Sequence, residues 1–129
     1  MGLCLLASRE LDFLYHELDD SISCNHCYLT KGVPARILKK LLEYHVYENR
    51  TYFEYREFKR DRELFVQPKT TNFEVRLRRL MKLVRIQLPR FRFEVIGPGK
   101  LHFSYAGEER LSIQSFRDPA QGMRAVVHR

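Results

Sequence analysis

The chain has 129 residues, 44% of them apolar and including nine Phe and seven Tyr, which suits one domain with a hydrophobic core and argues against a disordered basic tail. No apolar run approaches the roughly 20 residues that span a bilayer, and residues 3–7 are too short for the core of a signal peptide. We therefore expect a soluble, intracellular protein with no membrane partner.

The net charge of +7 is concentrated in one segment. Residues 1–30 carry a net charge of −4, residues 31–68 carry +3, residues 69–102 carry +7 and residues 103–129 carry +1. A concentrated basic segment is typical of a protein that binds a polyanion, although a solvated helix face has the same composition.

The first thirty residues predict a small antiparallel sheet. Leu11, Phe13 and Tyr15 alternate with polar residues, which indicates a half-buried strand. Turn signals at residues 19–20 and 25–26 predict two further short strands after it.

A C-x-x-C pair, Cys24 and Cys27, lies in the second of these hairpins. A structural zinc site needs four ligands, and the nearest histidines, His16 and His45, have no metal-ligand spacing. A redox C-x-x-C would open a helix after a strand. We expect neither a metal nor another cofactor.

Two helices are predicted between residues 34 and 65. Pro34 suits the first position of a helix, and the apolar spacing that follows predicts a helix over residues 34–47. Residues 51–55 fit either a short strand or a capping box, formed by Thr51 and Glu54, at the start of the next helix. That helix, charged and short, would cover residues 56–65, with Phe58, Leu64 and Phe65 as its apolar anchors.

A third helix is predicted from Thr70 or Thr71, both good N-caps, to just before Pro89. Its core face repeats with helical period at Phe73, Leu77, Leu80 and Val84. At 100° per residue, the side chains expected to point away from the core are those of Asn72, Val75, Arg76, Arg79 and Leu83.

Residues 90–105 predict a β-hairpin, with alternating aromatic and polar residues on both sides of the turn Gly97-Pro98-Gly99. Residues 108–116 are compatible with one more strand, and residues 117–129 predict a flexible tail. The order of sheet, three helices and hairpin predicts an α+β fold, a winged helix-turn-helix. The domain would span residues 1–116, with a β-platform at 1–30, a tri-helical core at 34–88 and a wing at 90–105.

Over about residues 11–105 the chain resembles the OmpR/PhoB-type winged helix-turn-helix DNA-binding domain of response regulators. The resemblance is carried by residues 29–30 before the first helix, residues 71–80 (TNFEVRLRRL) and residues 96–101 (IGPGKL), with Lys100 where the family has an aromatic residue. It implies a transcription regulator, cytoplasmic or nucleoid-associated, that reads double-stranded DNA. The chain leaves no room for a receiver domain, so we expect an isolated module, a fragment of a longer protein, or control by a regulatory partner protein.

On that reading the third helix enters the major groove and the hairpin lies along the backbone or minor groove. The candidates for reading base edges are Asn72, Arg76 and Arg79, with Val75 against a thymine methyl group. The candidates for phosphate contacts are Lys69, Thr70, Arg78, Lys82 and Lys100, and those lining the wing are Arg90, Arg92 and His102. For each cation the alternative is a surface ion pair, such as Arg78 with Glu74 four residues earlier.

Two other classes of function stay open. A winged helix can serve as a protein-interaction or RNA-binding adaptor, for which Tyr44, Tyr47 and Tyr52 would suit an exposed surface, and a homodimer could form through the N-terminal sheet. The tripeptide 57–59 (EFK), with Asp19 or Asp20, would mimic a nuclease metal site only if these residues lay on adjoining strands. We expect no enzyme.

Overall fold

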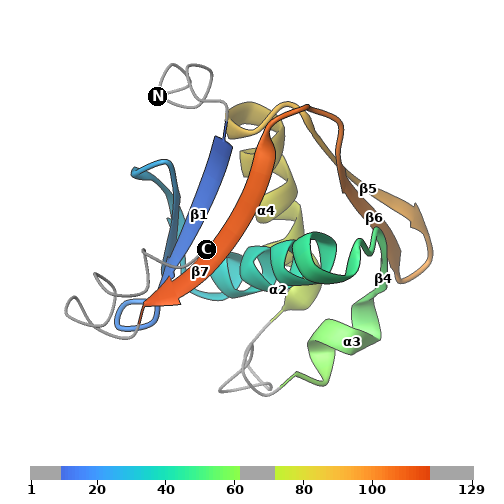
Figure 1. The fold of residues 1–129 in the computed structure, drawn as a ribbon. Coiled ribbons are helices and arrows are strands. Elements are labelled where there is room, and N and C mark those ends of the chain that lie inside the picture. The colour runs from blue at the N-terminus through green and yellow to red at the C-terminus, as the bar shows by residue number, and fades with distance from the viewer. Residues whose placement is uncertain (1–9, 62–71, 117–129) are drawn as a thin grey trace.

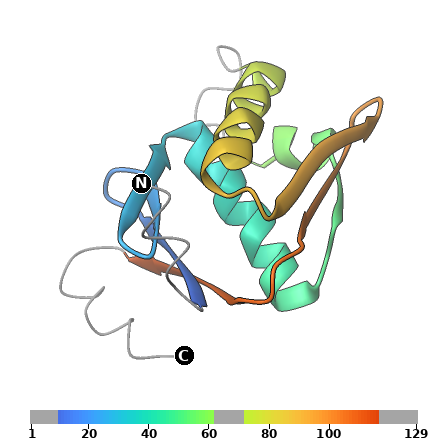
Figure 2. The ribbon, with the colours of Figure 1, turned by 90° about the horizontal axis from the view of Figure 1, so that it is seen from above.

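The computed structural model describes residues 10–61 and 72–116, which form two β-sheets with two long helices between them (Figure 1, Figure 2). One sheet contains β1 (Glu10–His16), β2 (Ser21–Cys24), β3 (Cys27–Lys31) and β7 (Arg110–Phe116). The other contains β4 (Tyr52–Glu54), β5 (Phe91–Gly97) and β6 (Lys100–Tyr105), and the helices are α2 (Val33–Glu48), α3 (Tyr55–Lys59) and α4 (Phe73–Gln87). The predicted α+β class is confirmed. In the described part of the chain, no helix is long and apolar enough to cross a membrane.

The first sheet has the strand order β3-β2-β1-β7. Its three N-terminal strands are antiparallel and follow the predicted alternation, with Leu11, Phe13 and Tyr15 buried. Asn25 and His26 both have positive φ, 50° and 69°, as a tight hairpin turn requires. The fourth strand, β7, comes from the other end of the described chain and pairs in parallel with β1. Its Ile113 is 2% exposed and fills the inner face of the sheet.

The second sheet has the order β4-β6-β5, so the hairpin is joined on the β6 side by a short strand from between α2 and α3. The strand alternative for residues 51–55 is therefore confirmed, and the Thr51–Glu54 capping box is wrong. Glu54 itself is the N-cap of α3 and forms a capping box with Glu57. α3 ends at Lys59, well short of the predicted residue 65, and Leu64 and Phe65 lie outside the described residues.

The long helices form where their apolar periodicity predicts. α2 has Pro34 in its first turn and buries Ala35, Ile37, Leu38, Leu41 and Leu42. α4 buries the four predicted core residues Phe73, Leu77, Leu80 and Val84 and ends just before Pro89. The N-cap of α4 is Asn72, not a threonine, because an Asn side chain accepts the bond from the first-turn N–H groups at least as well as a Thr side chain.

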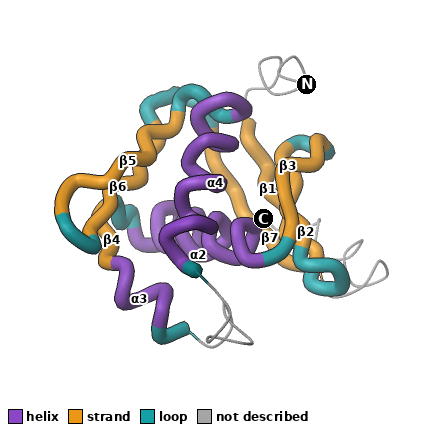
Figure 3. Tube along the Cα trace, turned by 180° about the vertical axis from the view of Figure 1, so that it is seen from behind, coloured by secondary structure: helices purple, strands orange, loops and turns teal. Residues whose placement is uncertain are grey.

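One aromatic core joins the two sheets. The ring of Phe13 in β1 meets Phe91 in β5 edge-on at 6.1 Å, and Phe91 stacks on Phe103 of β6 at 5.2 Å. Phe58 of α3 stacks on Phe73 of α4 at 5.6 Å, which fixes the start of α4 against α3. Seen from behind, α4 crosses in front of α2, with the hairpin on one side and β1 to β3 on the other (Figure 3).

Candidate nucleic-acid interface

The face of α4 opposite the core is exposed and basic. Exposed side chains on it are Glu74, Arg78, Arg79, Lys82, Arg85 and Ile86. Val75 and Arg76 are half-buried, and Leu83 packs against the core, so the expectation that Leu83 points away from the core is wrong. Lys69 and Thr70, two predicted phosphate contacts, lie outside the described residues.

Asn72 has a structural role that competes with the predicted reading of a base edge. Its Oδ1 accepts a hydrogen bond from the N–H of Val75 at 3.1 Å, which caps the helix. A bidentate contact with adenine needs the Asn oxygen as an acceptor and the Asn nitrogen as a donor. The capping bond holds the Asn72 side chain toward its own helix, so a bidentate contact with adenine would have to share this oxygen.

The alternative considered for Arg78, an ion pair with Glu74 four residues earlier, is not formed at ion-pair distance. Glu74 instead accepts a hydrogen bond from Lys59 of α3, with an Nζ to Oε2 distance of 2.9 Å. This bond lowers the pKa of the Glu74 carboxyl below its usual range. The only acidic residue of α4 is thus paired with the neighbouring helix, and Arg78 keeps an exposed guanidinium.

Cations elsewhere in the described structure are mostly paired. Short ion pairs join Arg36 to Asp20 and Lys40 to Asp61, both at 2.5 Å, and Arg90 to Glu109 at 2.7 Å. By contrast, seven cations on α4 and the hairpin have side chains without a hydrogen bond or ion pair to another described residue: Arg76, Arg78, Arg79, Lys82, Arg85, Arg92 and Lys100. Arg85 was not among the predicted contacts, although its spacing of three and seven residues from Lys82 and Arg78 places it on the same face.

The hairpin carries a second exposed surface beside α4. Arg92 and Lys100 are exposed, whereas His102 is half-buried, with its ring 5.0 Å from that of Tyr52 in β4. Its Nδ1 is buried and has no hydrogen-bond partner. The predicted contact at His102 is therefore partly covered by its neighbour on the sheet. At the end of β5, Val95 and Ile96 are about half exposed.

Of the three tyrosines expected on a partner surface, only Tyr52 is exposed with a hydroxyl that makes no hydrogen bond to another described residue. Tyr44 is half-buried and meets Phe53 edge-on at 6.1 Å, so its expected exposure is wrong. Tyr47 is exposed, but its hydroxyl donates a hydrogen bond to the carbonyl of Ile113 at 2.9 Å and ties α2 to β7.

The residues of the nuclease alternative are engaged in structural contacts. Glu57 lies in α3, not on a strand, and binds Arg50 at 2.5 Å while capping the helix. Asp20 accepts hydrogen bonds from Tyr15 and from Arg36, the second of which lowers the pKa of its carboxyl. Among the described residues no three His, Cys, Asp or Glu side chains are grouped as metal ligands.

The two cysteines of the C-x-x-C are not bonded to each other. Cys24 has a free thiol, buried in the sheet, and burial raises its pKa to about 12. A thiol in that state is a poor nucleophile at neutral pH. Cys27 is disulfide-bonded.

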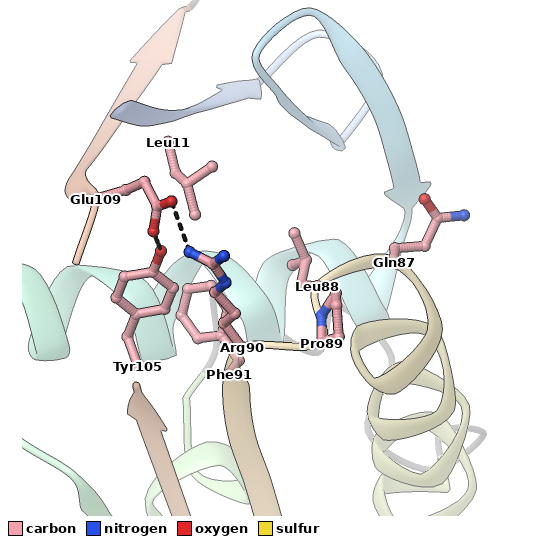
Figure 4. Close-up of a pocket in the computed structure, with 8 residues that line it drawn as sticks. All are labelled: Leu11, Gln87, Leu88, Pro89, Arg90, Phe91, Tyr105 and Glu109. Carbon is pink, nitrogen blue, oxygen red and sulfur yellow. Dashed lines mark hydrogen bonds and ion pairs between the residues drawn. The ribbon is translucent and has the colours of Figure 1, made fainter. Parts of the chain in front are cut away.

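A small pocket lies where β1, the end of α4 and the hairpin meet (Figure 4). Its wall is mainly apolar, and at its rim Glu109 accepts hydrogen bonds from Tyr105 and Arg90. Burial and this bond raise the pKa of Tyr105 to about 12. The pocket volume of about 40 Å³ is room for a few water molecules, and Arg90, Tyr105 and Glu109 at its rim are bonded to one another. The pocket lies at the junction of the two sheets.

Comparison with known proteins returned no matching family model, no matching curated protein and no matching solved structure.

Proposed function

We propose that the chain is a winged helix-turn-helix protein that binds double-stranded DNA sequence-specifically as a transcription regulator, with α4 in the major groove and the β5–β6 hairpin as its wing. The order α2, β4, α3, α4, β5, β6 supports this arrangement, because the strand between the first two helices joins the hairpin. The packing of Phe58 on Phe73 supports pairing of α3 and α4 as the helix-turn-helix unit.

The observation that carries the proposal is the set of unpaired cations on the exposed face of α4. A helix of 15 residues is about 22 Å long and 10–12 Å wide, which suits a major groove about 12 Å wide. Arg78, Lys82 and Arg85 share one side of this face, and Arg92 and Lys100 extend the charge onto the hairpin. Five such cations on phosphates would give a slope of log K against log salt of about −4.5.

Base reading is assigned to Arg79, which is exposed and unpaired near the middle of the face, and to the half-buried Arg76 beside it. An arginine bidentate to guanine contributes about 1–3 kcal/mol of discrimination. Val75 lies one turn before Arg79 and can meet a thymine methyl group. Asn72 would reach a base only while sharing its oxygen with the helix cap.

Selection of bound duplexes from a random pool, followed by fluorescence anisotropy of the selected duplex across salt concentrations, tests the proposal. We expect one enriched sequence, a salt slope near the value above, and weakened discrimination for Arg79→Ala. Lys31→Ala is the matched control, because Lys31 is an exposed cation on the first sheet. Absence of duplex binding at low salt, or tighter binding to a structured RNA of equal length, would overturn the proposal in favour of an adaptor.

A further inference from the structure

The outer edge of β5 has backbone groups that are free to pair with another strand. β5 is the last strand in the order β4-β6-β5, so one side of it has no neighbour in the sheet. The carbonyl of Arg90 accepts a hydrogen bond from the N–H of Ala106 across the hairpin at 2.8 Å, so every second residue of β5 from there bonds toward β6. The N–H and C=O groups of Phe93 and Val95 therefore point away from β6, and they make no hydrogen bond to another described residue.

The other sheet edges carry devices that hinder strand pairing. At the edge of β4, the Nε of Arg50 donates a hydrogen bond to the carbonyl of Tyr52 at 3.0 Å. At the edge of β7, the hydroxyl of Tyr47 bonds to the carbonyl of Ile113, and β3 has a register shift against β2. Capped and irregular edges resist pairing with other chains. From residue 91 to residue 95, β5 has a regular register and no cap from a described side chain.

The charges on β5 fit an antiparallel copy of the same strand. Arg92 and Glu94 are two residues apart, so their side chains lie on one face of the sheet, and both are exposed without an ion pair to another described residue. In a two-fold pair centred on Phe93, the outward N–H and C=O groups of the two Phe93 residues bond to each other, and each Arg92 lies opposite a Glu94. A pair centred on Arg92 or on Glu94 would place like charges opposite each other, which is unfavourable.

The same register covers an exposed apolar side chain. Phe91, Phe93 and Val95 lie on the other face of β5, where the two phenylalanines are buried and Val95 is 50% exposed. In the pair centred on Phe93, each Val95 lies opposite Phe91 of the second copy, close enough for their side chains to touch. The backbone groups, the charges and the apolar residue of β5 thus all favour one register.

We infer that the chain associates with a second copy of itself through β5, so that the two β4-β6-β5 sheets join about a two-fold axis at Phe93. The inference goes beyond the proposed function and does not depend on DNA binding. A contact along one strand edge is small beside the roughly 800 Å² per partner of a standard interface, so the dimer should dissociate on dilution. In the dimer Arg92 contacts the second copy and not a phosphate, which would lower the magnitude of the salt slope per copy by about 0.9.

Sedimentation equilibrium of the full chain without nucleic acid, over a wide range of protein concentration, tests the inference. Arg92→Glu and Glu94→Arg each place two pairs of like charges across the axis, and each should lower the association constant at least about tenfold. The double variant Arg92→Glu/Glu94→Arg exchanges the two charges and should associate as wild type does. An equimolar mixture of the two single variants should form a heterodimer, because every charge then faces its opposite.

Lys31→Glu is the matched control, because it reverses an exposed cation on the first sheet and changes the net charge as Arg92→Glu does. It should leave the association constant unchanged. All these side chains are exposed, so the thermal midpoints of the variants should match that of wild type. A wild type that stays monomeric at the highest concentration, or single variants that associate as wild type does, would overturn the inference. Failure of both the double variant and the mixture to associate would also overturn it, because the register centred on Phe93 requires the exchange to be neutral. None of these outcomes bears on DNA binding, which the anisotropy titration tests separately.

Discussion

Removing Arg78 and Lys82 together tests whether the exposed face of α4 neutralises phosphates. The two residues are four apart on the helix, exposed, and without ion pairs among the described residues. If each neutralises one phosphate, the double variant Arg78→Ala/Lys82→Ala lowers the magnitude of the salt slope by about 1.8. That change corresponds to about a 30-fold loss of affinity at 0.15 M salt and about a 200-fold loss at 0.05 M.

The fold should not change, because substitutions at exposed positions without partners usually alter the free energy of unfolding by less than about 0.5 kcal/mol. Anisotropy titrations of one selected duplex at four salt concentrations give the slope. The control variant Lys31→Ala/Arg110→Ala removes two exposed cations from the first sheet and changes the net charge equally. Equal losses for both double variants would refute the reasoning, because the affinity would then depend on total charge and not on the α4 face.

Three predictions concern the supports of the interface. Asp20→Asn should lower the free energy of unfolding by about 1 kcal/mol at pH 7. The bond from Arg36 lowers the pKa of Asp20 in the folded state. The stabilisation is therefore present above the pKa of the unfolded chain and is lost as the pH falls through the pKa of the folded state. The free energies of unfolding of wild type and variant in urea should then converge in acid. Tyr47→Phe removes the hydrogen bond to β7 and should lower the free energy of unfolding, measured by thermal unfolding, by about 1 kcal/mol. Gly99→Ala should lower the free energy of unfolding by about 1 kcal/mol, because Gly99 has a positive φ although an added Cβ would meet open space. Gly97→Ala is the control and should change it little, because Gly97 has equal space and no positive φ.

Elements whose signals are local could be predicted from the sequence. The core face of α4 follows from the spacing of Phe73, Leu77, Leu80 and Val84, because a helix repeats every 3.6 residues whatever surrounds it. The hairpin turn follows in the same way from its two glycines. The fourth strand of the first sheet could not be assigned a place, since β7 pairs with β1 across about a hundred residues of chain. Only the shared core, to which Ile113 contributes, selects that pairing.

The predicted helix and hairpin form in the structure, but the contacts of single residues on them depend on the fold. Asn72 fits both a helix cap and a base contact, and sequence alone does not decide between them. Arg78 and Glu74 have the right spacing for an ion pair, yet the fold brings Lys59 within 2.9 Å of Glu74. In both cases the partner is specified by the three-dimensional structure and not by spacing along the sequence.

The pair between Lys59 and Glu74 links the charge pattern of the sequence to the proposed interface. Both side chains are about half exposed, so the pair adds little to stability. Its effect is on which face of α4 carries negative charge. It turns the one carboxylate of α4 toward α3, and Arg78, Lys82 and Arg85 have no described acid at ion-pair distance. Because the fold pairs Glu74 with Lys59, the cations of the basic segment are concentrated on one exposed face of α4. A count of charges along the chain does not reveal this arrangement.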